Sequence, residues 1–352
     1  MRAFKGSGRL GLLVLLLVAV VFVGCRRRAA TPPPETGPAE PTAPSIATTG
    51  AGQALSRVTS DPITEEWPSL SPDGRTLLFQ TVLYDQSTGQ SQFSVAGVDP
   101  STGGRRTLFT SPNASAWNPD WLPDGSSFVY VTDAMGTSAV VRALSSAPNS
   151  GVSVIVNAQS APDPSMPSVS PDGQRVAFTT VMNSQSQVAI SGLDGSNLTI
   201  LGEGTSPRWH PSGAQLIFSR RVGNFDQLFS VDAATGTGLT QLTNNQANNR
   251  YPTWSPDGRY VVFTSNMAGS WDLYALRPDG TGLVQLTQGP SNATSPHWAR
   301  DGFVYFSSDA AGAGWDLWRF MPVGELQLQV QAPTPAPAPA PVAEDPAAPT
   351  AP

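Results

Sequence analysis

Side chains that could carry out catalysis are few in this chain. The 352 residues include two histidines, His210 and His297, and one cysteine, Cys25. A single histidine in a predicted strand is more often structural than catalytic. One cysteine and two histidines do not make a zinc or iron–sulfur site, and the Gly-x-Ser-x-Gly motif of an activated serine does not occur. We therefore expect no cofactor and no serine or thiol nucleophile.

Carboxylates offer a second chemistry, metal-dependent hydrolysis, because several oxygen ligands around one site can hold a calcium ion. Glu65, Glu66 and Asp120 lie in segments that the repeat described next predicts as inner strands. They come from only two of six copies, which is a weak basis for coordination. The aspartates of the turns, such as Asp257, are expected to cap loops instead.

A motif that occurs six times must position these residues. Its clearest copy, residues 251–263, reads Tyr-Pro-Thr-Trp-Ser-Pro-Asp-Gly-Arg-Tyr-Val-Val-Phe. Successive copies are 40 to 51 residues apart, which is the length of one four-stranded propeller blade. The glycines that align the copies are Gly74, Gly125, Gly173, Gly213, Gly258 and Gly302. Six residues before them stand Pro68, Pro119, Pro167, Pro207, Pro252 and Pro296.

Each copy predicts a β-hairpin. Proline presets the backbone of a tight turn, aspartate bonds its own backbone and glycine accepts the left-handed conformation, so Ser-Pro-Asp-Gly joins two antiparallel strands. The run 260–263 is apolar on both faces, as in a strand between neighbouring sheets. We predict an all-β fold, a six-bladed β-propeller of four-stranded antiparallel blades over residues 53–331.

The ring must also close, because closure removes exposed sheet edges. The segment Leu55–Thr59 resembles the end of an outer strand, since Val58 precedes Leu70 by the same 12 residues that separate Leu286 from Trp298. We predict that this segment is the outer strand of the last blade. The alternating segment Glu325–Val330 competes for the same position.

The motif Pro-x-Trp-Ser-Pro-Asp-Gly-Arg, with Asp-Leu-Tyr and Gln-Leu-Thr after it, resembles the TolB-type propeller repeat, a relative of WD repeats, over roughly residues 54–320. Copies four and six depart from it, with His210 and Ala299 at the start of their turns. The resemblance implies a periplasmic scaffold that engages partners at a channel mouth. The alternative is a lactonase-like, calcium-dependent hydrolase with its site in the channel. The fold does not decide between them.

Residues beside each inner-strand proline should face the channel mouth. Tryptophan, tyrosine and arginine are enriched among residues that dominate binding energy. The structural alternative for any one of these rings is packing between blades. The predicted partner-binding residues are Glu66, Trp67, Trp117, Arg250, Tyr251 and His297.

Export and a membrane tether are predicted from the termini. Residues 1–24 combine basic residues with an apolar run, as in a signal peptide. The segment Phe22–Cys25 resembles a lipobox, which implies lipidation of Cys25. An uncleaved anchor and a simple signal peptide remain as alternatives. Residues 25–52 and 332–352 are rich in proline and alanine and are predicted to be a disordered linker and tail.

The net charge of the chain argues against nucleic acid as a partner. Without residues 1–24, the chain has 17 arginines and 26 acidic residues, a net charge of −9. A net acidic surface repels nucleic acid. We expect a monomeric ring, tethered outside the cytoplasm to the cytoplasmic or outer membrane, that binds a protein or an envelope polymer.

Overall fold

The computed structural model describes residues 46–85, 89–109, 114–312 and 314–326. Contacts divide the chain into residues 1–43 and residues 44–352, and all described residues belong to the second unit. The predictions for the signal peptide, for Cys25 and for the tail 332–352 fall outside the described residues. Within these residues, no helix is long and apolar enough to cross a membrane.

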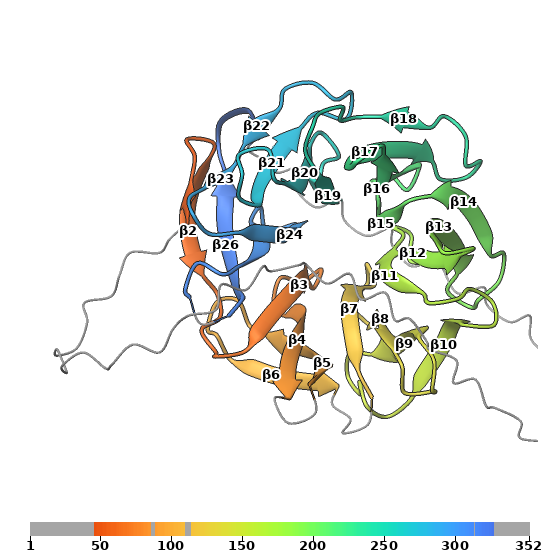
Figure 1. Ribbon diagram of the computed structural model, residues 1–352. Helices are drawn as coiled ribbons and strands as arrows, with labels where there is room; N and C mark the ends of the chain where they lie inside the picture. Colours follow the sequence, from red (N-terminus) through yellow and green to blue (C-terminus); the bar gives the residue numbers. More distant parts are fainter. Residues whose placement is uncertain (1–45, 86–88, 110–113, 313, 327–352) are drawn as a thin grey trace, which may run out of the picture. The chain divides into compact units, whose positions relative to one another are not determined.

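Six four-stranded antiparallel sheets surround a central axis as the blades of a propeller (Figure 1). Blade 1 consists of β3 (Thr64–Leu70), β4 (Leu77–Asp85), β5 (Gln90–Val98) and β6 (Arg105–Phe109). Blade 2 consists of β7 (Ala116–Trp121), β8 (Ser127–Thr132), β9 (Ala139–Leu144) and β10 (Val152–Asn157). Blade 3 consists of β11 (Ser165–Val169), β12 (Arg175–Met182), β13 (Gln185–Gly192) and β14 (Thr199–Glu203).

The second half of the ring repeats this order until the last blade. Blade 4 consists of β15 (Thr205–Trp209), β16 (Gln215–Val222), β17 (Phe225–Asp232) and β18 (Thr240–Gln241). Blade 5 consists of β19 (Asn249–Trp254), β20 (Val261–Ser265), β21 (Asp272–Leu276) and β22 (Val284–Gln285). Blade 6 consists of β24 (Ala293–Trp298), β25 (Val304–Ser308), β26 (Asp316–Pro322) and, from the start of the chain, β2 (Gly52–Arg57). The predicted fold class is confirmed.

Strand β2 closes the ring. Ser56 pairs with Arg319 and Arg57 with Trp318, and the amide of Val58 donates to the carbonyl of Leu317 at 2.7 Å. The prediction that the segment ending at Thr59 is the outer strand of the last blade is confirmed. The competing segment begins in a 3-10 helix, η1 (Gly324–Leu326), and its residues 327–330 lie outside the described residues.

Ordered structure also extends before residue 53, where the propeller was expected to begin. Strand β1 (Ala47–Thr48) pairs with β23 (Thr287–Gln288) beside blade 5. Ile46 is buried in the cluster that fills the space between blades 5 and 6. The last residues of the predicted linker therefore pack on the propeller, because they carry an apolar side chain and pair with a strand.

Successive blades pack through the large residue that follows each inner-strand proline by two positions. The indole N–H of Trp121 donates to the carbonyl of Ser69 at 3.1 Å, and that of Trp209 to Ser168 at 3.0 Å. Six hydrophobic clusters of the described residues each combine two neighbouring blades. Burial between blades therefore holds the ring together, and the inner strands are left to line the axis.

Candidate functional site

A β-bulge interrupts every inner strand just before its proline. The register of β3 with β4 shifts between Glu66 and Ser69, and the five other inner strands shift at the equivalent place. The residue before each proline has a positive φ, between 50° and 61°. A left-handed non-glycine residue is uncommon, and such strain collects at functional sites. These residues, here named the mouth residues, are Trp67, Asn118, Met166, Ser206, Tyr251 and Ser295.

Two predicted site residues, Trp67 and Tyr251, contact each other although their blades are not neighbours in the ring. Their ring centroids are 4.7 Å apart and their planes are inclined by 81°, an edge-to-face contact. Trp67 belongs to blade 1 and Tyr251 to blade 5, and blade 6 lies between these blades. Burial raises the pKa of the Tyr251 hydroxyl, and the nearby carboxylates of Glu66 and Asp226 act in the same direction. The neutral phenol and the indole therefore form an aromatic bar at the mouth.

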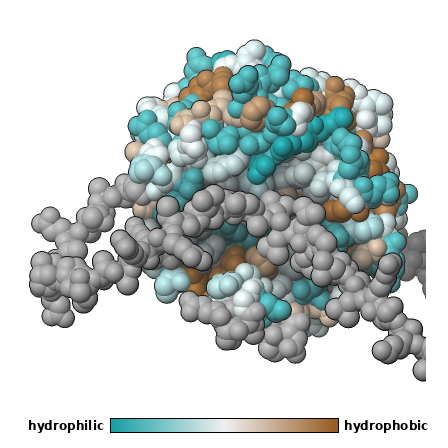
Figure 2. Space-filling view, viewed as in Figure 1, coloured by the Kyte–Doolittle hydropathy of each residue, from teal (hydrophilic) through white to brown (hydrophobic). Residues whose placement is uncertain are grey.

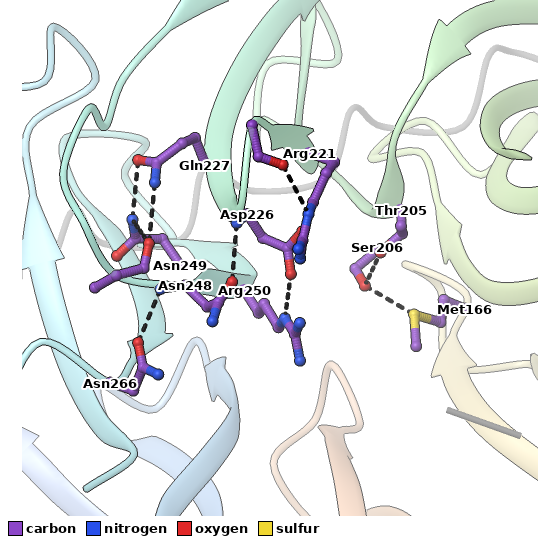
Figure 3. Close-up of polar contacts among 12 residues, drawn as sticks. Met166, Thr205, Ser206, Arg221, Asp226, Gln227, Asn248, Asn249, Arg250 and Asn266 are labelled. Carbon is purple, nitrogen blue, oxygen red and sulfur yellow. Dashed lines mark hydrogen bonds and ion pairs between the residues drawn. The ribbon is translucent and has the colours of Figure 1, made fainter. Parts of the chain in front are cut away.

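Arg250 lies beside this bar and is held by the hairpin of the preceding blade. Its Nε donates to Asp226 Oδ2 at 2.5 Å, and its guanidinium lies 5.4 Å from the centre of the Trp271 ring. Arg221 Nη1 approaches the other oxygen of Asp226 at 3.6 Å. Figure 3 shows Asp226 between the two arginines. A single carboxylate thus faces two guanidinium groups, which leaves the cluster positively charged.

A hydrogen-bonded ladder joins Glu66 and Gln80 of blade 1 to the mouth residues of blades 2 to 4. Gln80 donates to Glu66 at 2.9 Å and accepts from the amide of Asn118 at 3.2 Å. The Asn118 side chain accepts from the amide of Met166 at 3.2 Å, and Ser206 Oγ donates to the Met166 sulfur at 2.8 Å. Burial raises the pKa of Glu66, and the bond from Gln80 opposes that rise. This half of the mouth is therefore fixed by internal bonds.

Trp117 lies apart from the aromatic bar. Its ring centroid is 6.2 Å from that of Phe93 in β5, the third strand of the neighbouring blade 1. The structural alternative considered from the sequence, packing between blades, describes this residue better than a place at the mouth. The structure therefore brings Glu66, Trp67, Arg250 and Tyr251 together and leaves Trp117 to the side.

The residue after each proline contributes to a second ring, here named the channel collar. Its members are Ser69, Asp120, Ser168, Arg208, Thr253 and His297. Blades 2, 4 and 6 supply the three ionisable members, and all three are only partly buried. The charge of Arg208 acts on both Asp120 and His297. Such coupling between blades that are not neighbours is expected where side chains face the shared axis.

His297 therefore belongs to the collar, one layer from the mouth. Burial, with the positive charge of Arg208 as a second cause, lowers the pKa of its imidazole to about 3. The ring is neutral at physiological pH and offers one donor and one acceptor. His210, by contrast, lies in a turn, where its Nδ1 is 2.7 Å from Ser212 Oγ and its ring contacts Trp254. That contact supports its interpretation as structural.

The three acidic residues considered for calcium do not gather. Glu65 pairs with Arg105 at 2.7 Å, Glu66 bonds Gln80, and Asp120 accepts from Ser69 Oγ at 3.0 Å and from the amide of Val169 at 2.8 Å. Within the described residues, no group of three histidine, cysteine or acidic side chains is placed to hold a metal ion. The residues present do not fit the calcium site of the alternative prediction.

Sequence reasoning missed Asp226, Trp271 and Arg208. Asp226 and Trp271 lie at the hairpins between second and third strands, a position at which the copies differ in length and composition. Arg208 directly follows an inner-strand proline, so the repeat itself could have identified it. On the face shown in Figure 2, hydrophobic residues form small patches separated by hydrophilic ones.

Comparison with known proteins finds a family model that matches part of the chain. Residues 151–283 match the model described as the TolB beta propeller domain. Over 176 residues the chain is 31% identical to an uncharacterised protein of Agrobacterium fabrum, a match that covers 45% of this chain and 57% of that relative. The chain thus spans little more than half of the relative's length.

Solved structures share the fold at low sequence identity. TolB from Acinetobacter baumannii superposes with a TM-score of 0.54 and 20% identity, over 70% of this chain and 63% of that one. A gluconolactonase from Xanthomonas campestris superposes with a TM-score of 0.58 and 16% identity, over 85% of this chain and all of that one. Identities this low show a common fold alone, so the function must be argued from the site.

Proposed function

We propose that this chain, a six-bladed propeller that carries the TolB beta-propeller repeat, is a protein-binding scaffold and that its partner docks at the channel mouth. The single observation that carries the proposal is the aromatic bar of Trp67 and Tyr251, two residues with left-handed backbones whose rings contact each other. Both rings are partly exposed. Tryptophan and tyrosine are enriched among the residues that dominate the binding energy of protein interfaces.

The charges around the bar support a protein partner with an acidic segment. Arg250 and Arg221 share one carboxylate, that of Asp226. Arg250 is also positioned over Trp271, so its guanidinium is preorganised rather than free to rotate. An acidic side chain of a partner would meet a fixed positive group beside two aromatic rings. This arrangement supports binding rather than catalysis, because the two aromatic rings and the fixed guanidinium are sufficient to hold an acidic segment.

Site-directed photo-crosslinking of the full chain in intact cells tests the proposal. A photoreactive amino acid would replace Trp67 at the mouth or, as a control on the opposite face, Asp257 in a turn. We expect one protein to be captured from position 67 only. A second, unlabelled copy of the chain should compete with it, and the copy should fail to compete when it carries Trp67→Ala together with Arg250→Ala. Equal competition by that double variant would refute the mouth as the partner site.

We further propose that the scaffold is exported and tethered by a lipid on Cys25. The support is the sequence of residues 1–25 and the TolB-type repeat. Metabolic labelling with an alkyne-bearing fatty acid should label the native chain, and Cys25→Ser should abolish the label. A labelled Cys25→Ser chain would contradict the tether, and protection of the native chain from protease added to intact spheroplasts would contradict export.

A further inference from the structure

Arg208 in the channel collar is a cation with few partners. Its Nη1 donates to the carbonyl of Pro167 at 3.1 Å, and among the described residues it takes part in no ion pair. A guanidinium has five N–H groups in a fixed plane. Arg208 is only partly buried, so the donors that Pro167 does not use remain for the channel.

The nearest acidic group does not neutralise this cation. Asp120 uses its two oxygens on Ser69 Oγ and on the amide of Val169, so blades 1, 2 and 3 are joined through it. Arg208 acts on Asp120 only through space. The collar therefore presents a guanidinium and a carboxylate that face one channel without pairing.

The other side of the collar adds a neutral donor. His297 in blade 6 and Thr253 in blade 5 follow Arg208 around the ring. The imidazole of His297 is uncharged at physiological pH, so it offers a ligand one N–H without a second positive charge. A ligand between blades 4 and 6 would thus meet one cation and one neutral donor.

One place in the second strands differs between blades 4 to 6 and blades 1 and 3. Ser219, Thr264 and Ser307 occupy equivalent places in the second strands of blades 4, 5 and 6, and their buried hydroxyl oxygens have no hydrogen-bond partner. At the same place in blades 1 and 3, Gln80 and Thr179 bond the amides of Asn118 and Ser206. Buried polar groups without partners are rare in native proteins. At this place, the second strands of blades 4, 5 and 6 therefore carry hydroxyls without a partner among the described residues, whereas Gln80 and Thr179 are used in bonds between blades.

We propose that the channel collar binds a small 2-hydroxy carboxylate. The carboxylate lies on the guanidinium plane of Arg208, which matches its two oxygens. His297 donates to the same group, and the ligand's hydroxyl donates to Asp120. This site is distinct from the mouth and does not depend on the proposed protein partner, because it uses the residues after the prolines rather than those before them.

Calorimetric titration of the full chain with sodium glycolate tests this, with sodium acetate as the matched ligand that lacks the hydroxyl. We expect saturable binding of glycolate at least about tenfold tighter than that of acetate, since a hydrogen bond to a charged group contributes about 1.5–3 kcal/mol. Arg208→Gln should abolish binding of both ligands. Arg300→Gln, an exposed arginine in a turn of blade 6, should leave both affinities unchanged.

Two further variants protect the test against misfolding. Arg208→Lys keeps the charge but loses the planar fork, and should weaken glycolate binding at least about tenfold while the circular dichroism spectrum stays native. Asp120→Asn should reduce the difference in affinity between glycolate and acetate. Absence of saturable binding to the native chain, equal binding by Arg208→Gln, or tighter binding of inorganic phosphate than of glycolate would each overturn the proposal.

Discussion

The hydroxyl of Thr59 accepts a hydrogen bond of 2.9 Å from the amide of Leu317, which lies 258 residues further along the chain. Thr243 and Thr287 accept the same bond from the amides of Leu228 and Leu273 in blades 4 and 5. The closure of the ring therefore copies the outer-strand contact of ordinary blades, although its two partners come from opposite ends of the propeller.

We expect Thr59→Val to lower the free energy of unfolding by about 1–3 kcal/mol, because it leaves the buried amide of Leu317 without an acceptor. Chemical denaturation of the full chain measures this. Thr107→Val, an exposed threonine in β6, should change stability by less than about 0.5 kcal/mol. A Thr59→Val chain as stable as the native chain would show that this bond does not contribute to closure.

Gly258→Ala should destabilise the propeller more than Gly213→Ala. Both glycines have φ near +70° in equivalent turns, so alanine is strained at either position. A Cβ at Gly258 would lie 2.3 Å from His210 Nε2, whereas at Gly213 it would lie 3.8 Å from Pro171 Cδ. We expect losses of about 2 kcal/mol or more and about 1 kcal/mol, respectively.

Thermal unfolding of both glycine variants and of His210→Ala checks this difference. The double change of Gly258 and His210 should cost less than the sum of the single changes, because the imidazole that collides with the new methyl group is gone. If the stability losses of the two single variants are strictly additive in the double variant, backbone strain alone causes the loss in Gly258→Ala.

The stability of the propeller should depend on pH through His297. Its pKa is about 3 when folded, below the ordinary 6.5. The unfolded chain therefore binds more protons between these values, and the free energy of unfolding gained from a neutral His297 is lost as pH falls through that interval. His297→Asn should reduce the rise of stability between about pH 4 and 6.5, measured by urea denaturation.

The titration of Glu65 should change the stability of the propeller with pH in the opposite direction to that of His297. Burial raises its pKa to about 7 from 4.5, although Thr59 and Arg105 oppose the rise. The folded chain then holds more protons in that interval, so this contribution to stability is lost as pH rises through it. Glu65→Gln should make stability rise more steeply with pH. A change of slope with the same sign in both variants would contradict these assignments.

Asn118→Ala should weaken the ladder at the mouth. The Asn118 side chain bonds Met166 of blade 3, and asparagine tolerates the left-handed backbone better than alanine does. We expect a loss of about 1–3 kcal/mol in denaturation experiments. Asn118→Gly removes the same bond but relieves the backbone, so it should cost less. If glycine costs as much as alanine, backbone strain is not part of the effect.

The sequence was sufficient for the fold because the same contacts recur. The proline, the turn glycine and the large apolar residue recur at the same strand positions in successive blades, so six copies determine one arrangement. The spacing of Val58 from Leu70 also identified the closing strand. Position along a repeat does not give distances across the axis, however. The contact of Trp67 with Tyr251 depends on the ring diameter and on two left-handed residues, neither of which the residue types encode.

The neighbours of Arg250 could not be predicted from the sequence, for a related reason. Asp226 and Trp271 reach it from hairpins whose lengths vary between blades, so they have no fixed offset from the motif. For Trp117, the position near a proline favoured the mouth, whereas the structure places its ring beside Phe93 of blade 1.

The left-handed bulges have an evolutionary consequence. The kink before each proline has nearly the same φ whether tryptophan, asparagine, methionine, serine or tyrosine stands there, so it does not require one particular side chain. Single codon changes at six places could therefore alter what the propeller recognises while its architecture is inherited unchanged.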